Sequence, residues 1–276
     1  MYVQSADTRQ RKPITVPSLR AMKTRGEKIV ALTCYDASFA AQLDAAGVDI
    51  ALVGDSLGMV VQGRSSTLPV TLDEMVYHTA VSARGLSCAL LIADLPFMSY
   101  RNIRTALESS RRLLAEGGAA MVKLEGGAEW VCEVIAALTA RDVPVCAHLG
   151  LTPQSVHKLG GYRMQGKNKD AATRLREQAQ AVTQAGADLL VLESVPAALA
   201  ERITKELPIP TIGIGAGAEC DGQVLVLYDL LGITPGKRPK FSKDFLAGRD
   251  SIQSAIAAYV DDVRAGKFPT AENILG

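Results

Sequence analysis

Short apolar runs rich in β-branched residues alternate along this chain with longer stretches of helical period, and no other feature constrains the fold as strongly. Strands that are apolar at every position are covered on both faces, which is typical of a parallel sheet. Several helical stretches end in glycine, as at Gly47 and Gly186, where glycine can supply the left-handed cap of a helix. The expected strands are Ile29–Thr33, Val48–Val53, Ala89–Ala93, Ala120–Leu124, Val143–Ala147, Leu189–Leu192 and Thr211–Ile214, with an eighth near Gln223–Leu227. The expected helices are Ser38–Ala46, Leu72–Arg84, Ile103–Glu116, Ala128–Ala140, Ala172–Ala185 and Ala197–Leu207.

Seven or eight β-α units in 276 residues, with no linker of low complexity, favour a single (β/α)8 TIM barrel of the α/β class over a doubly wound sheet. The first residues are polar and basic and offer nothing to bury, so 1–14 is expected to form a flexible N-terminal arm. A helix is expected to start near Pro17. The catalytic barrel is then expected over 15–268, followed by a short tail at 269–276.

The charge balance excludes some partners. The chain has 30 Lys and Arg against 29 Asp and Glu, spread along its length, which gives no electrostatic footprint for nucleic acid or an anionic membrane. It contains no long apolar window and no apolar signal segment near Met1, so a cytoplasmic protein is expected. The five cysteines are scattered without a C-x-x-C pair, which predicts reduced, buried thiols.

Ionisable residues follow five of the expected strands. A TIM barrel carries its chemistry at the carboxyl ends of its strands, so these side chains are expected to converge on one mouth. The residues are Asp55, Asp94, Lys123 with Glu125, His148 and Glu193.

The three carboxylates Asp55, Asp94 and Glu125 indicate a magnesium site. They supply hard oxygen ligands without an accompanying cluster of Cys or His, which is the composition expected for Mg2+ and not for Zn2+. A sparse carboxylate set also leaves coordination positions for a chelating substrate. Each carboxylate taken alone also fits a solvated loop residue or a helix N-cap.

The remaining three residues each allow two interpretations. Lys123 lies two residues before Glu125, so both side chains face the same side of the strand, where Lys123 could pair with an anionic substrate or with Glu125 itself. Glu193 emerges from an apolar strand into a partly desolvated rim, which suits a general base, unless it forms an ion pair with Arg202 or another nearby base. His148 is either a polar site residue or a histidine satisfied by a backbone carbonyl.

Two glycine motifs carry weaker signals. Gly54-Asp55-Ser56-Leu57-Gly58 fits the G-x-S-x-G pattern of serine hydrolases, but no histidine follows His157 to act as the late base of that class. Gly213-Ile214-Gly215-Ala216-Gly217 stops short of a dinucleotide-binding fingerprint. It is better interpreted as a close-approach loop at the mouth of the barrel, which only glycine permits.

The motifs taken together resemble the ketopantoate hydroxymethyltransferase family over about residues 15–268. Departures are confined to the N-terminal arm, the Gly166–Asp170 loop and the tail after Phe268. The resemblance rests on six strings in order: Val53-Gly54-Asp55-Ser56-Leu57-Gly58-Met59, Ser66-Thr67-Leu68-Pro69-Val70-Thr71, Ala93-Asp94-Leu95-Pro96-Phe97-Met98, Val122-Lys123-Leu124-Glu125-Gly126-Gly127, His148-Leu149-Gly150-Leu151-Thr152-Pro153-Gln154 and Gly213-Ile214-Gly215-Ala216-Gly217.

The resemblance implies a (β/α)8 barrel related to the phosphoenolpyruvate and isocitrate lyase group, assembled as a homodecamer. It implies transfer of a hydroxymethyl group from 5,10-methylenetetrahydrofolate to 3-methyl-2-oxobutanoate, forming 2-dehydropantoate through a Mg-stabilised enolate in pantothenate and coenzyme A synthesis. The roles it implies are Mg2+ binding by Asp55, Asp94 and Glu125, proton abstraction by Glu193, and oxo-acid binding by Asp55, Ser56, Asp94 and Lys123. His148 is placed with these substrate-binding residues, in a supporting polar role.

Three other functions are weighed against this one. A Mg2+-dependent C–C or P–C lyase on the same barrel would share the carboxylate site but need no folate. A serine esterase would use Ser56 as its nucleophile. A non-catalytic barrel that only binds a ligand is disfavoured by the ionisable residues at five strand exits.

Overall fold

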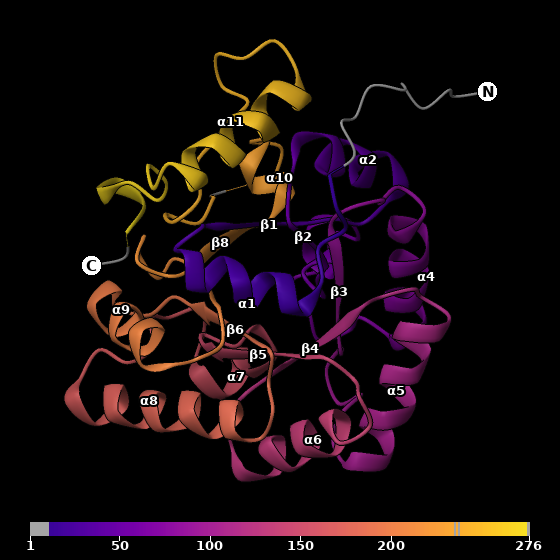
Figure 1. Cartoon of the computed structure of the whole chain (residues 1–276), viewed down its shortest axis with the longest axis vertical. Coiled ribbons are helices and arrows are strands. Elements are labelled where there is room, and N and C mark those ends of the chain that lie inside the picture. The colour runs from indigo at the N-terminus through magenta and orange to yellow at the C-terminus, as the bar shows by residue number, and fades with distance from the viewer. Residues whose placement is uncertain (1–10, 235, 237, 275–276) are drawn as a thin grey trace.

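Eight parallel strands close into a barrel in chain order (Figure 1), which confirms the predicted (β/α)8 fold. The computed structural model describes residues 11–234, 236 and 238–274. Because β1 pairs with both β2 and β8, the sheet has no free edge. The strands are β1 (Ile29–Thr33), β2 (Ile50–Val53), β3 (Leu90–Asp94), β4 (Met121–Glu125), β5 (Val145–Gly150), β6 (Leu189–Glu193), β7 (Thr211–Ile214) and β8 (Gly222–Leu225).

The six predicted helices form most of the outer layer: α2 (Ala37–Ala46), α4 (Leu72–Ala83), α5 (Ile103–Ala115), α6 (Glu129–Thr139), α8 (Lys169–Gln184) and α9 (Ala197–Glu206). Within the described residues, β7 and β8 are joined without a helix. The elements that the sequence analysis did not define are α1 (Val16–Arg25), α3 (Leu57–Val60), η1 (Pro153–Ser155), α7 (Val156–Leu159), α10 (Leu227–Leu230), α11 (Ile252–Arg264) and η2 (Ala271–Asn273).

Several predicted boundaries differ from the structure by two or three residues, among them those of β2 and β5 and the start of α8. Lys169 and Asp170 were expected in a loop, but they form the first turn of α8. The side chain of Asn168 accepts a hydrogen bond from the backbone N–H of Ala171 and so caps this helix. The helix therefore begins three residues before its apolar periodicity does.

The two faces of each strand belong to different cores. Outward-facing residues such as Val122 and Leu124 join the large core between strands and helices, whereas the inward-facing Met121 joins a separate cluster inside the barrel. The same alternation points Lys123 and Glu125 inward. Apolar side chains thus fill the lower part of the lumen, and ionisable side chains form its upper layer.

Helix α1 closes the amino-terminal end of the barrel and crosses the strands in Figure 1. It begins at a capping box of Thr15 and Ser18 and ends at Gly26, which adopts the left-handed conformation. Its buried residues Leu19 and Met22 belong to the apolar cluster of the lumen. The barrel is therefore sealed at this end, and its ionisable layer lies at the other.

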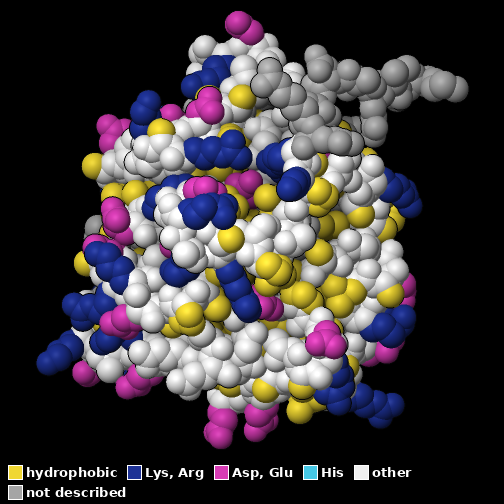
Figure 2. All heavy atoms as spheres, viewed as in Figure 1, with side chains coloured by type: hydrophobic (Ala, Val, Ile, Leu, Met, Phe, Trp, Pro, Cys, Tyr) yellow, Lys and Arg dark blue, Asp and Glu magenta, His cyan; other side chains and the backbone are white. Residues whose placement is uncertain are grey.

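Basic and acidic side chains are intermingled on the face shown in Figure 2, in line with the balanced net charge. None of the described helices is long and apolar enough to cross a membrane. The division into arm, barrel and tail stays a prediction. Residues 1–10 of the arm lie outside the described part of the chain. In the tail, the Asn273 amide donates a hydrogen bond to the Ser242 carbonyl at 3.1 Å.

Candidate active site

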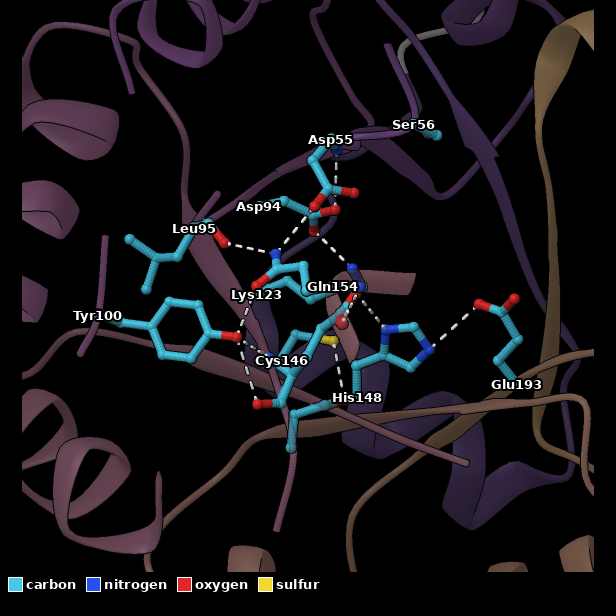
Figure 3. A network of polar contacts seen from close by, with 12 residues as sticks. Asp55, Ser56, Asp94, Leu95, Tyr100, Lys123, Cys146, His148, Gln154 and Glu193 are labelled. Atoms are coloured by element: carbon cyan, nitrogen blue, oxygen red, sulfur yellow. Dashed lines mark hydrogen bonds and ion pairs between the residues drawn. The ribbon is translucent and has the colours of Figure 1, made fainter. Parts of the chain in front are cut away.

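The register of the barrel places the predicted site residues on adjacent strands. Asp94 at the end of β3 pairs with Lys123 of β4, and Glu125 of β4 pairs with His148 of β5. Glu193 ends β6, where it pairs with Gly150 of β5. The predicted convergence at the carboxyl ends of the strands is therefore present. Figure 3 shows these side chains as one polar network.

Asp94 lies at the centre of one half of this network. Its Oδ1 accepts a hydrogen bond from Lys123 Nζ at 2.7 Å, and its Oδ2 accepts one from the backbone N–H of Asp55 at 3.1 Å. The internal partner of Lys123 is thus Asp94, whereas the sequence had suggested Glu125. A Cβ at Gly54 would lie 2.8 Å from Ser56 Oγ, so a side chain at position 54 would displace the Ser56 hydroxyl.

Burial strengthens the electrostatic repulsion among the carboxyl groups of this cluster. Asp55 is 3% exposed, and its pKa is raised well above the ordinary value by desolvation and then by the charges of Asp94 and Glu125. Burial alone would lower the pKa of the Lys123 ammonium, but the surrounding carboxylates raise it instead. The site therefore holds one firmly protonated lysine among three buried carboxyl groups, and a further cation would relieve their repulsion.

His148 joins this cluster to Glu193 (Figure 3). Its Nδ1 lies 3.5 Å from Glu125 Oε1 and its Nε2 lies 3.2 Å from Glu193 Oε2, although neither contact has hydrogen-bond alignment. Burial and the Lys123 charge lower the pKa of His148, but the two glutamates outweigh them and raise it to about 9. The imidazole therefore pairs with two carboxylates, and the alternative of a backbone carbonyl partner is wrong.

Glu193 sits at the border between the lumen and solvent. Its side chain is 14% exposed, and the ion-pair partner found for it is His148, not Arg202. The next residue, Ser194, has a φ of 49°, a left-handed conformation that costs about 1–3 kcal/mol for a residue with a side chain.

The two glycine motifs now have structural explanations. Ser56 precedes the short helix α3, and its Oγ is 2.8 Å from the hydroxyl of Tyr35. Among the described residues no histidine bonds to Ser56, so the base that a serine hydrolase needs is missing there. Gly217 has a φ of 84°, and a Cβ at this position would lie 2.6 Å from the Cβ of Ala197. The predicted close approach at this loop is confirmed.

The oxygen ligands of this site suit Mg2+ in their chemistry, but they do not form a complete coordination shell. Asp55 and Asp94 lie side by side in Figure 3. Glu125 is engaged elsewhere, because its Oε2 accepts the backbone N–H of Gln154 at 3.0 Å. Across the described residues, no group of three or more His, Cys, Asp or Glu side chains is placed to hold a metal. Two carboxylates completed by water and substrate nevertheless suffice for Mg2+, which is usually bound in this way.

Sequence reasoning missed three polar residues of the network. Tyr35 contacts Ser56. Gln154 contacts Asp55, and Tyr100 contacts Gln154 and the backbone of Glu125 (Figure 3). Gln154 and Asp55 are 99 positions apart, so no spacing rule connects them. The available signal was that Gln154 follows His148 closely within a string that carries the family resemblance.

Comparison with known proteins identifies close relatives. Residues 13–271 match the family model described as ketopantoate hydroxymethyltransferase. A protein of Alkalilimnicola ehrlichii named 3-methyl-2-oxobutanoate hydroxymethyltransferase is 57% identical over 266 residues, which cover 96% of each chain. A protein of the same name from Paraburkholderia phytofirmans is 56% identical, covering 99% of this chain and 98% of the relative.

Solved structures share the fold at much lower identity. A phosphonopyruvate hydrolase matches with a TM-score of 0.61 at 17% identity, covering 91% of this chain and 97% of the other. A 2,3-dimethylmalate lyase matches with a TM-score of 0.55 at 18% identity, covering 76% and 80%. These likenesses support the barrel architecture and nothing finer.

Proposed function

The chain belongs to the ketopantoate hydroxymethyltransferase family, and from this membership we propose that it transfers a hydroxymethyl group from 5,10-methylenetetrahydrofolate to 3-methyl-2-oxobutanoate, forming 2-dehydropantoate. The enzyme is a transferase, and the proposal concerns its co-substrate, metal, mechanism and place in pantothenate and coenzyme A synthesis. The observation that carries it is the convergence of buried Asp55, Asp94 and Lys123 with His148 and Glu193 at one end of the barrel.

Asp55 and Asp94 are the proposed direct ligands of Mg2+, and Glu125 is proposed to act nearby, within reach through water. When bound, Mg2+ would supply a Lewis acid that polarises the 2-oxo group and makes the C3 proton more acidic. The repulsion among the buried carboxyl groups supports this assignment.

Glu193 is the proposed general base. Its carboxylate would accept the C3 proton of the oxo acid, and the imidazole of His148, 3.2 Å away, would orient it. The remaining solvent contact of Glu193 would let the proton leave the site again. His148 is therefore a positioning residue in this scheme, although the family resemblance had suggested contact with the substrate.

Lys123 and Ser56 are proposed to hold the oxo acid. The Lys123 ammonium is buried and stays protonated, so it can attract the substrate carboxylate while remaining paired with Asp94. The deprotonated C3 would then form a bond to the one-carbon unit of the folate. Water would supply the oxygen of the new hydroxymethyl group, and tetrahydrofolate would leave.

The alternatives receive less support. A C–C or P–C lyase shares the fold, but the lyase and hydrolase structures are below 20% identical to this chain, whereas the transferases reach 57%. A serine esterase would need a base beside Ser56, and among the described residues no histidine bonds to it. Cytoplasmic localisation and assembly into a homodecamer belong to the proposal and rest on family membership alone.

The proposal is tested by NMR in heavy water, with Mg2+ and without folate. The experiment measures the loss of the C3 proton signal of 3-methyl-2-oxobutanoate. Wild type should exchange the proton, and Glu193→Gln should slow exchange by at least about 100-fold, the usual contribution of a general base. The matched control is Glu177→Gln on the outer helix α8, which should exchange like wild type. Equal rates for Glu193→Gln and wild type would remove Glu193 from the mechanism.

A further inference from the structure

We propose that Gln154 is a positioning residue that holds the carboxylates of Asp55 and Glu125 in the arrangement that binds the divalent cation, and that Tyr100 fixes the orientation of its amide. The inference rests on the proposed function, since it concerns the proposed metal site. It goes beyond that function because it assigns a role to two residues that neither bind the metal nor touch the reacting atoms.

The contacts of Gln154 join the ends of three strands. Its Nε2 donates a hydrogen bond to Asp55 Oδ2 at 2.8 Å and another to the carbonyl of Leu95 at 3.0 Å. Its backbone N–H donates to Glu125 Oε2 at 3.0 Å. One residue of η1, after β5, is thus tied to the chain after β2, after β3 and at the end of β4. Because Gln154 is only 7% exposed, water competes little for these bonds.

The orientation of the Gln154 amide follows from its partners. The backbone carbonyl of Leu95 can only accept hydrogen bonds, so the amide nitrogen must face Leu95, and it then also faces Asp55 Oδ2. The amide oxygen then faces Tyr100, whose hydroxyl donates to it at 2.7 Å. Burial raises the pKa of Tyr100, so its hydroxyl keeps this proton. The ring is itself held by stacking on Trp130, with 6.0 Å between ring centroids.

This arrangement matters because like charges tend to move apart. Buried carboxyl groups repel one another, and Lys123 is bonded to Asp94, not to Asp55 or Glu125. The N–H groups of Gln154 donate to both of these carboxylates, and the other partner of Glu125, His148, lies 3.5 Å away without hydrogen-bond alignment. The N–H groups hold the free oxygen of Asp55 beside Asp94 before the cation arrives. Groups that orient metal ligands in this way change metal affinity by about 10–100-fold when they are removed.

A purely structural role for Gln154 makes a different prediction. If the network only filled space, loss of the amide would lower the melting temperature but leave the affinity for the cation unchanged. The decisive quantity is therefore the dissociation constant for the metal alone, in the absence of oxo acid and folate. Mn2+ is a suitable probe because its free form is measured directly by electron paramagnetic resonance.

The experiment titrates wild type, Gln154→Leu and Tyr100→Phe with Mn2+, and Mg2+ competition shows that both ions use one site. We expect the Kd for Mn2+ to rise at least about 10-fold in Gln154→Leu. A smaller rise, about 2–5-fold, is expected in Tyr100→Phe, which keeps the ring and its stacking but frees the amide. The matched control is Gln223→Leu, because Gln223 is also buried but donates only to the carbonyl of Gly217. Its Kd should stay within about twofold of wild type.

The outcomes separate this inference from the proposed function. A Kd for Gln154→Leu equal to that of wild type, or an equal loss in Gln223→Leu, overturns the positioning role and leaves the metal site standing. Absence of Mn2+ binding by wild type overturns both. If Gln154→Leu does not fold, Tyr100→Phe decides, and an unchanged Kd in that variant overturns the inference.

Discussion

At the scale of single residues, the two-residue period of a strand determines which side chains reach the site. Met121, Lys123 and Glu125 share the inner face of β4, and the next strand along continues that layer with His148. These positions could be predicted because periodicity and strand ends are local properties of a sequence. The partners were less predictable: Lys123 pairs with Asp94, and Gln154 reaches Asp55 across 99 positions, because these contacts depend on how the barrel closes.

The cysteines give a prediction at the same scale. The structure confirms that all five are free, with Cys34, Cys146 and Cys220 buried and with Cys88 and Cys132 partly exposed. A thiol reagent at pH 8 should therefore modify two thiols in the native protein and five after denaturation, measured by absorbance. Rapid modification of a third native thiol would contradict the buried positions.

The buried thiols also predict how the free energy of unfolding changes with pH. Burial raises the pKa of Cys34 and Cys220 from 9.0 to about 11, so the unfolded chain ionises first as pH rises. Their contribution to the free energy of unfolding is complete below pH 9 and is lost as pH approaches 11. The free energy of unfolding, measured in reducing buffer, should fall across this range, and a double Cys→Ala variant should fall less steeply.

At the scale of elements, helices with a clear apolar period were predicted to within a few residues, whereas the short helices were not. Helix α8 begins early because Asn168 caps it, and α1 was recognised only as a helix start near Pro17. Helix α11 packs against α2 and β1, a position that depends on the finished barrel and not on its own sequence. Nothing in the sequence of α1 alone shows that it covers the end of the lumen.

The packing of α1 can be tested with Leu19→Ala. Leu19 is 1% exposed and packs on the lumen cluster, so its truncation should leave a cavity and lower the free energy of unfolding by about 2–5 kcal/mol. Urea denaturation measures the change. Thr24→Ala, on the exposed side of the same helix, should cost less than about 0.5 kcal/mol. Equal costs for the two variants would show that α1 does not pack on the barrel.

At the scale of the whole molecule, the balanced charge of the chain hides a local imbalance. One lysine faces three buried carboxyl groups at the end of the barrel, while charges of both signs are mixed on the surface in Figure 2. Bulk charge therefore says nothing about the ligand. The repulsion among the carboxyl groups of the site arises instead from the closed sheet, which brings residues from separate β-α units together, away from water.

Because α1 covers the amino-terminal end, the lumen of the barrel, as far as the described residues show, opens to solvent only at the carboxyl ends of the strands. A small molecule bound against Lys123 can leave only by the route through which it entered, and a large molecule lying across the opening would trap it. Under the proposed function, kinetics should thus be ordered, with the oxo acid entering first, the folate second, and the folate product departing before 2-dehydropantoate. Product-inhibition patterns measure this order, and a random-order pattern would contradict entry through one opening.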